Sequence, residues 1–205
     1  NAEEEVVGGL VTADIGIPFE AEYFVNYGDF LRLKNRNPES HKGNNGSVLI
    51  VGGNKDYSGA PAIAGMAAIG AGADLVYVAS PELSAQAIKS LSPDLIVRSL
   101  KGDKLLLSHA DEIVELSKNA DAVLLGPGLG IDEETSKTLN VLVSKIKKPI
   151  VLDADALKQV DLSLIRNRED IILTPLDFKN PVQQRVNFLY TEIFKNFGQI
   201  IEQAA

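Results

Sequence analysis

Short, continuously apolar runs alternate with longer helical stretches from residue 47 onward, and this alternation constrains the fold more than any other feature. Such runs are typical of parallel strands that are buried on both faces and joined by helices. The expected strands are residues 47–51, 73–79, 95–100, 122–125, 150–152 and 171–173. The expected helices are residues 59–72, 80–90, 108–118, 132–147 and 185–197. We therefore predict an α/β fold with a mainly parallel central sheet between two helical layers.

Two helix starts are predicted from their capping residues. Ser80 is a favoured N-cap, and Pro81 suits the first position of the helix that follows. Ser108 and Asp111 resemble a capping box that opens the next helix. His109, in the first turn of that helix, is expected to be a solvated surface residue.

Composition excludes several classes of function. The chain has 205 residues and a net charge of -8, which disfavours nonspecific binding to nucleic acid or to an anionic membrane. It contains no cysteine, which excludes disulfides and thiolate chemistry and fits a cytoplasmic protein. The two histidines do not have metal-ligand spacing, so we predict no protein-bound metal. The acidic start lacks a secretory pattern, and because it also lacks Met we expect a larger parent polypeptide.

Three loops at strand ends are candidates for a ligand site, because ligands of open parallel sheets bind where the strands end. GGNKDYSGAP at residues 52–61 joins a strand to a helix whose N–H groups can meet anionic oxygens. GPGLG at residues 126–130 follows another strand, and three glycines in five residues indicate a special backbone shape. Asp153 and Asp155 follow a third strand. The alternatives are tight turns for the two glycine clusters and a helix-capping pair for the aspartates.

The order of these motifs resembles one enzyme family. HKGNNGSVLIVGG at residues 41–53 and YSGAP at 57–61 resemble the opening motif of ADP- or ATP-dependent NAD(P)H-hydrate dehydratases. GPGLG at 126–130, LDADAL at 152–157 and LTP at 173–175 resemble later motifs of the same family. Each piece alone is modest, but their order and spacing together are specific.

The resemblance implies a ribokinase-like three-layer αβα fold. It also implies dehydration of (6S)-NAD(P)H hydrate back to NAD(P)H, driven by ADP or ATP with Mg²⁺, in a homo-oligomeric enzyme that uses no nucleic acid or membrane. The nucleotide would phosphorylate the ring hydroxyl, and phosphate would then leave. By motif position, the substrate-binding residues would be Ala60, Gly126, Gly128, Gly130, Asp153 and Asp155, with Tyr57 and Asn54 as weaker candidates.

The sequence departs from the family near its C-terminus. Leu176 stands where the family has a substrate-contacting histidine. The GGTGD segment, which holds the nucleotide phosphates and the catalytic Asp in the family, has no counterpart, so no catalytic residue is assigned. We therefore expect residues 41–205 to be a dehydratase domain that lacks its C-terminal portion. TADIGIP at residues 12–18 resembles the end of an NAD(P)H-hydrate epimerase domain, so residues 1–40 are interpreted as a remnant or linker from that domain.

Three functions therefore stay open at the level of sequence. The first is the dehydration reaction. The second is a small-molecule kinase of the same fold, against which the opening motif argues. The third is an inactive dinucleotide-binding or structural fragment, because the nucleotide-binding segment is missing.

Overall fold

The computed structural model describes residues 37–174. The chain divides into two compact units, Asn1–Glu39 and Ser40–Ala205, and the elements below belong to the second. Residues 1–36 of the predicted epimerase remnant and the predicted helix over residues 185–197 lie outside the described range.

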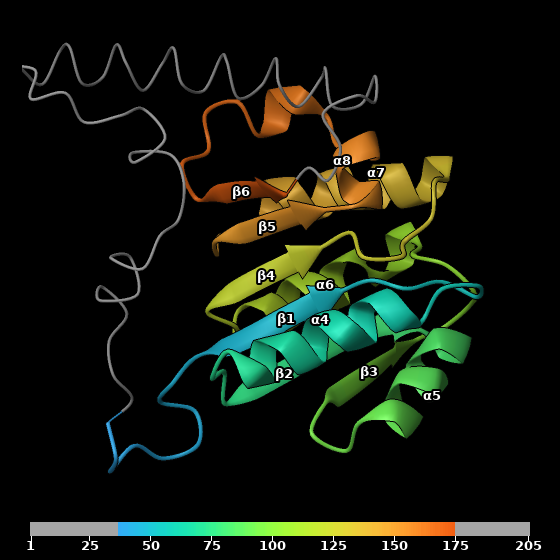
Figure 1. The fold of residues 1–205 in the computed structure, drawn as a ribbon. Coiled ribbons are helices and arrows are strands. Elements are labelled where there is room, and N and C mark those ends of the chain that lie inside the picture. Colours follow the sequence, from blue (N-terminus) through green and yellow to red (C-terminus); the bar gives the residue numbers. More distant parts are fainter. Residues whose placement is uncertain (1–36, 175–205) are drawn as a thin grey trace, which may run out of the picture. The chain divides into compact units, whose positions relative to one another are not determined.

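The described unit is built on a six-stranded parallel sheet with the strand order β3-β2-β1-β4-β5-β6. The strands are β1 (Ser47–Val51), β2 (Leu75–Pro81), β3 (Ile96–Leu100), β4 (Ala122–Leu125), β5 (Ile150–Asp153) and β6 (Ile171–Thr174). All six were expected, each within two residues of these bounds. The order places β1, β4 and β5 side by side in the middle of the sheet, as Figure 1 shows.

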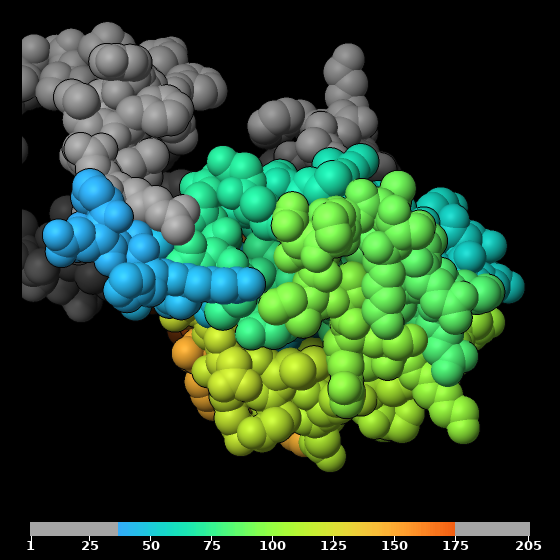
Figure 2. Space-filling view, turned by 90° about the horizontal axis from the view of Figure 1, so that it is seen from below, coloured from blue at the N-terminus to red at the C-terminus, as the bar shows by residue number. Residues whose placement is uncertain are grey.

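Helices cover both faces of the sheet, which confirms the predicted α/β architecture (Figure 1). The helices are α4 (Gly59–Gly70), α5 (Glu82–Leu91), α6 (Ala110–Ser117), α7 (Glu133–Lys145) and α8 (Asp155–Gln159), with short 3-10 turns at Leu107–His109 and Leu162–Leu164. Side chains of α4 and α5 pack on one face, and those of α6, α7 and α8 pack on the other. Figure 2 shows from below that the green segment carrying α5 and β3 and the yellow segment around β4 form one continuous surface.

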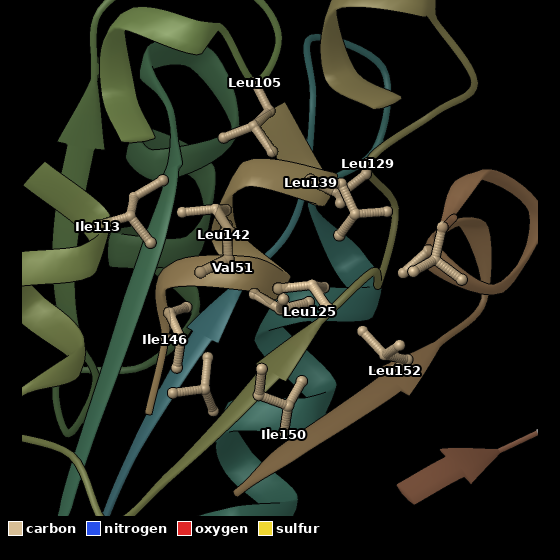
Figure 3. Close-up of a cluster of buried hydrophobic side chains, with 14 of the residues drawn as sticks. Val51, Leu105, Ile113, Leu125, Leu129, Leu139, Leu142, Ile146, Ile150 and Leu152 are labelled. Carbon is tan, nitrogen blue, oxygen red and sulfur yellow. The ribbon is translucent and has the colours of Figure 1, made fainter. Parts of the chain in front are cut away.

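The core is divided by the sheet because successive strand side chains point to opposite faces. Leu49 faces the larger cluster with α6, α7 and α8, whereas Ile50 faces the smaller cluster with α4 and α5. Figure 3 shows the strand residues Leu125 and Leu152 and the α7 residues Leu139 and Leu142 within one buried cluster. Each such fully buried aliphatic side chain contributes about 1.5–3 kcal/mol to folding.

The predicted start of the helix after β2 is wrong by one residue, since the N-cap is Pro81 and not Ser80. β2 continues through Pro81, which pairs with Leu100 of β3, and α5 begins at Glu82. Ser80 does not cap the helix, because its hydroxyl is buried and donates to Ser84 Oγ at 2.8 Å. Pro81 occupies the N-cap position instead.

The predicted capping box at Ser108 is also wrong, and so is the surface location of His109. Ser108 lies in a 3-10 turn, and α6 begins at Ala110 without a side-chain cap. His109 is buried, and its Nδ1 accepts a hydrogen bond from the Leu106 N–H at 3.1 Å. The turn packs inward between the buried residues Leu105 and Ala110, so the imidazole cannot reach solvent.

Two aspartates bind backbone N–H groups at the amino edge of the sheet. Asp74 Oδ2 accepts from the backbone N–H groups of Gly43 and Asn45, each at 2.9 Å. Asp121 Oδ2 accepts from Ser47 N at 2.8 Å and from Ser47 Oγ at 2.9 Å. These bonds from Ser47, the backbone N–H foremost, lower the pKa of the Asp121 carboxyl below its ordinary value. The segment before β1 is thereby fixed to the start of β2, and the first residue of β1 is fixed to the start of β4.

Candidate functional site

The three candidate loops converge at the carboxyl edge of the sheet. They follow β1, β4 and β5, which are neighbours, and parallel strands end at one edge. The Gly53 N–H donates to Pro127 O at 2.8 Å, which joins the first loop to the second. The Gly130 N–H donates to Asp155 Oδ2 at 2.9 Å, which joins the second loop to the third.

The first and second loops touch along their backbones. A Cβ at Gly52 would overlap Pro127 O, and one at Gly128 would come within 3.0 Å of Tyr57 Cβ. A Cβ at Gly130 would lie 2.6 Å from Asn54 Nδ2. The glycines of both motifs are therefore needed where one loop lies against the other.

The second and third loops meet at Gly126. Its φ of +130° is one that side-chain-bearing residues rarely adopt, and a Cβ there would overlap Asp153 O. Opposite it, Ala154 has φ 49° and ψ -114° and is the one non-glycine residue with positive φ among residues 37–174. Such a conformation costs on the order of 1–3 kcal/mol and persists only where the surroundings impose it.

The loop after β1 is closed by its own side chains. Asn54 Oδ1 accepts from the backbone N–H groups of Asp56 at 2.8 Å and Tyr57 at 3.0 Å. Behind it, Ser84 Oγ donates to Tyr57 O at 3.2 Å. The Tyr57 side chain itself is 58% exposed, so it is available to a ligand at this edge. Asn54 is in contrast already used to shape the loop.

The two aspartates after β5 have different surroundings. Asp153 Oδ1 accepts from the Thr174 hydroxyl at 2.6 Å. Asp155 is in the first turn of α8, and its oxygens bind Gly130 N and Lys158 Nζ. The N-cap of α8 is Ala154, with no side-chain cap, so the capping-pair interpretation of these aspartates is wrong.

Among the helices that begin at this edge, α7 is capped by a side chain, whereas α4, α5 and α8 are not. Asp132 caps α7 by accepting from the N–H groups of Glu134 and Thr135. The Lys104 ammonium donates to Asp132 at 2.8 Å and lowers the pKa of this carboxyl. Ser58 makes no such bond with α4, so the first-turn N–H groups around the exposed Ala60 have no side-chain cap. Uncapped N–H groups at a helix start attract anionic oxygens.

The described residues contain no group of three or more His, Cys, Asp or Glu side chains that could hold a metal ion. Among residues 37–174, no helix has the length and apolar character needed to span a bilayer.

Sequence reasoning missed Gln159, Ser84 and the strained Ala154. Gln159 Nε2 donates to Gly130 O at 2.8 Å, and its Oε1 accepts from Asp132 N at 3.1 Å. The four-residue spacing from Asp155 was the available signal, since it places both side chains on one face of a helix. The backbone partners lie 29 and 27 residues earlier in the chain, and no local pattern reveals them.

Comparison with known proteins identifies the family. Residues 48–178 match the family model described as NAD(P)H-hydrate dehydratase, which is more than half of the chain. The bifunctional NAD(P)H-hydrate repair enzyme of Methanothermobacter thermautotrophicus is 50% identical over 177 residues, covering 85% of this chain and 34% of that protein. The enzyme of the same description from Pyrobaculum aerophilum is 42% identical over 175 residues, covering 84% and 34%. The chain thus spans about a third of the length of these relatives.

Solved structures show the same fold. A hypothetical protein from Streptococcus mutans superposes with a TM-score of 0.56 at 33% identity, covering 69% of this chain and 50% of that one. The ADP/ATP-dependent NAD(P)H-hydrate dehydratase of Bacillus subtilis, co-crystallised with ATP/Mg²⁺, gives a TM-score of 0.54 at 24% identity, covering 79% and 54%. This confirms the predicted ribokinase-like fold. The family model matched over residues 48–178 establishes that the chain belongs to the NAD(P)H-hydrate dehydratase family.

Proposed function

We propose that the carboxyl edge binds hydrated NAD(P)H and that the protein returns it to NAD(P)H with the help of a nucleotide. The observation that carries this proposal is the mutual packing of the loops after β1, β4 and β5. The relatives from M. thermautotrophicus and P. aerophilum are named for NAD(P)H-hydrate repair. The family's motifs therefore lie on three loops that form one surface.

The substrate contacts we propose follow from the chemistry of this surface. The uncapped start of α4 at Ala60 suits the pyrophosphate of a dinucleotide. The backbone of the loop that contains Gly126, Gly128 and Gly130 can approach a ligand closely, since these residues carry no side chain. The exposed Tyr57 ring offers an apolar surface, and Asp153 offers a carboxylate at the end of β5.

The nucleotide supplies the phosphoryl group that makes the ring hydroxyl a better leaving group. The B. subtilis protein was co-crystallised with ATP/Mg²⁺. We propose that this protein likewise uses ADP or ATP together with Mg²⁺. Residues 37–174 hold no acidic or histidine cluster for the ion. Its ligands would then come mainly from the phosphates, which is usual for Mg²⁺ bound with a nucleotide. In this proposal, the role of residues 37–174 is to bind and orient the dinucleotide.

The proposal includes a cytoplasmic, homo-oligomeric protein. The absence of cysteine from the sequence fits a reducing compartment and supports the location. Light scattering on the purified protein would measure its mass in solution, and a mass equal to one chain would contradict the homo-oligomer.

The test is recovery of the absorbance of reduced nicotinamide from hydrated NADH, with Mg²⁺ and either ATP or ADP. The proposal predicts recovery that depends on the nucleotide. Gly128→Ala should abolish recovery by forcing the second loop away from Tyr57. Gly72→Ala is the matched control, since Gly72 also has positive φ but has nothing within 4 Å.

Two other results would overturn parts of the proposal. No recovery with either nucleotide, together with calorimetric binding of hydrated NADH, would remove the catalytic part and leave a binding module. No binding of hydrated NADH would remove the proposal entirely.

A further inference from the structure

Gln159 makes a two-point contact with the backbone of the loop after β4. Its Nε2 donates to Gly130 O at 2.8 Å, and its Oε1 accepts from Asp132 N at 3.1 Å. The side-chain amide therefore bonds this segment much as a neighbouring strand would. The Gln159 carbonyl in turn accepts from Ser136 Oγ of α7 at 3.1 Å, which fixes the end of α8 against α7.

Asp155 completes this contact from one turn earlier on α8. Its Oδ2 accepts from Gly130 N at 2.9 Å, so both backbone polar groups of Gly130 are bound by side chains of α8. Its Oδ1 accepts from Lys158 Nζ at 2.7 Å, and the side chain is only 16% exposed. Both carboxylate oxygens thus have partners within the protein.

The loop that these residues hold has little stiffness of its own. Gly126, Gly128 and Gly130 all have positive φ, and glycine loses more conformational freedom on ordering than any other residue. A ligand that had to order this loop would bind more weakly by that entropic cost. The bonds from α8 order it before a ligand arrives.

We propose that Asp155 and Gln159 are positioning residues that hold Gly130 and Asp132 in place and so preorganise the loop after β4 for the dinucleotide. The expected effect on dinucleotide binding rests on the proposed function. The hydrogen bonds to Gly130 and Asp132 do not depend on it. Asp155 then acts on ligand binding indirectly, by holding the backbone of Gly130, and not by an interaction between its own charge and the ligand. An asparagine, whose Oδ1 can also accept from an N–H, should therefore replace it.

The first test uses the protein without ligand and so does not depend on the proposed function. Hydrogen exchange of the Gly130 amide is followed by NMR. We expect exchange at least about tenfold faster in Asp155→Ala than in the wild type, because a hydrogen bond to a charged acceptor is lost. Lys158→Ala is the matched control; it removes the ion pair but leaves the bond to Gly130, and should leave the exchange rate unchanged. Equal Gly130 exchange in Asp155→Ala and in the wild type would overturn the proposal.

The second test is the calorimetric affinity for hydrated NADH. Asp155→Ala and Gln159→Ala should each weaken binding by about tenfold, and Asp155→Asn should recover most of the loss, while all variants keep a cooperative thermal transition. If Asp155→Asn binds as weakly as Asp155→Ala, the carboxylate charge matters and the positioning role is wrong. If the Gly130 amide behaves as expected but the wild type binds no hydrated NADH, the proposed function fails and the positioning geometry stands. Should Asp155→Ala not fold, Gln159→Ala carries both tests, with exchange followed at the Asp132 amide, which donates to Gln159 Oε1.

Discussion

Both edges of the sheet require glycines, but for different reasons. At the amino edge, Gly43 and Gly72 have φ values of +100° and +105°, and a Cβ at either would meet nothing within 4 Å. At the carboxyl edge, a Cβ at Gly126 or Gly52 would overlap the backbone of another loop. Glycine is thus required at the amino edge only by the local turn, and at the carboxyl edge by contact between loops distant in the chain.

The two edges also differ in whether their backbone N–H groups are bound by side chains. At the amino edge, Asp74 binds N–H groups of the segment before β1, and Asp121 binds the N–H of Ser47, the first residue of β1. At the carboxyl edge, Ser58 leaves the start of α4 without a side-chain cap, and Tyr57 is exposed. We infer that the amino edge is arranged for stability and the carboxyl edge for contact with a ligand.

The largest expected effect is that of Gly126→Ala. It combines a positive φ with overlap on Asp153 O, so we expect a loss of about 4 kcal/mol or more in the free energy of unfolding. Gly72→Ala, which suffers the φ penalty alone, should lose about 1–2 kcal/mol. Urea unfolding of the two variants measures both. Equal losses would mean that loop contact adds nothing at the carboxyl edge.

An intermediate effect is expected for Gly52→Ala. Gly52 does not have positive φ, so the cost comes from overlap with Pro127 O and should be about 1–3 kcal/mol. Gly70→Ala at the end of α4, where a Cβ meets nothing, should be neutral or stabilising by up to about 1 kcal/mol. Thermal denaturation compares the pair, and a stable Gly52→Ala protein would contradict the close approach of the first two loops.

The smallest effect concerns the acid response of the amino edge. Hydrogen bonds from Ser47 lower the pKa of Asp121, so its charged form stabilises the fold above its ordinary pKa of 3.8. That stabilisation is lost as the pH falls through the lower folded-state value. Asp121→Asn should therefore have a lower melting temperature than the wild type at pH 7, with the gap closing as the pH falls below about 4.

The exposed Asp94, in the segment before β3, gives the control for this titration. Because the Asp94 side chain is exposed, Asp94→Asn should have the wild-type melting temperature at pH 7. If the difference in melting temperature between Asp121→Asn and the wild type stayed unchanged down to pH 2, the bonds from Ser47 would not depend on the charge of Asp121.

The strands could be predicted from sequence because they are continuously apolar, and β1 and β4 were predicted with the observed bounds. The carboxyl-edge loops could be predicted because each directly follows such a strand. Helix starts were harder, since capping depends on where a hydroxyl points. Ser80 has the right residue type for an N-cap, but its hydroxyl donates to Ser84. The spacing of Gln159 from Asp155 places both side chains on one helix face, but their partners could not be predicted, because these are backbone groups that only the strand order brings near.

The most direct test of the account is NMR mapping of hydrated NADH onto the backbone amides of the protein. The account predicts that amides in residues 52–60, 126–132 and 153–155 shift together with one saturation curve, while those in residues 43–47 and 72–74 do not shift. Shifts centred on the amino edge, or loop shifts that saturate at different concentrations, would contradict a single ligand surface built from the three loops.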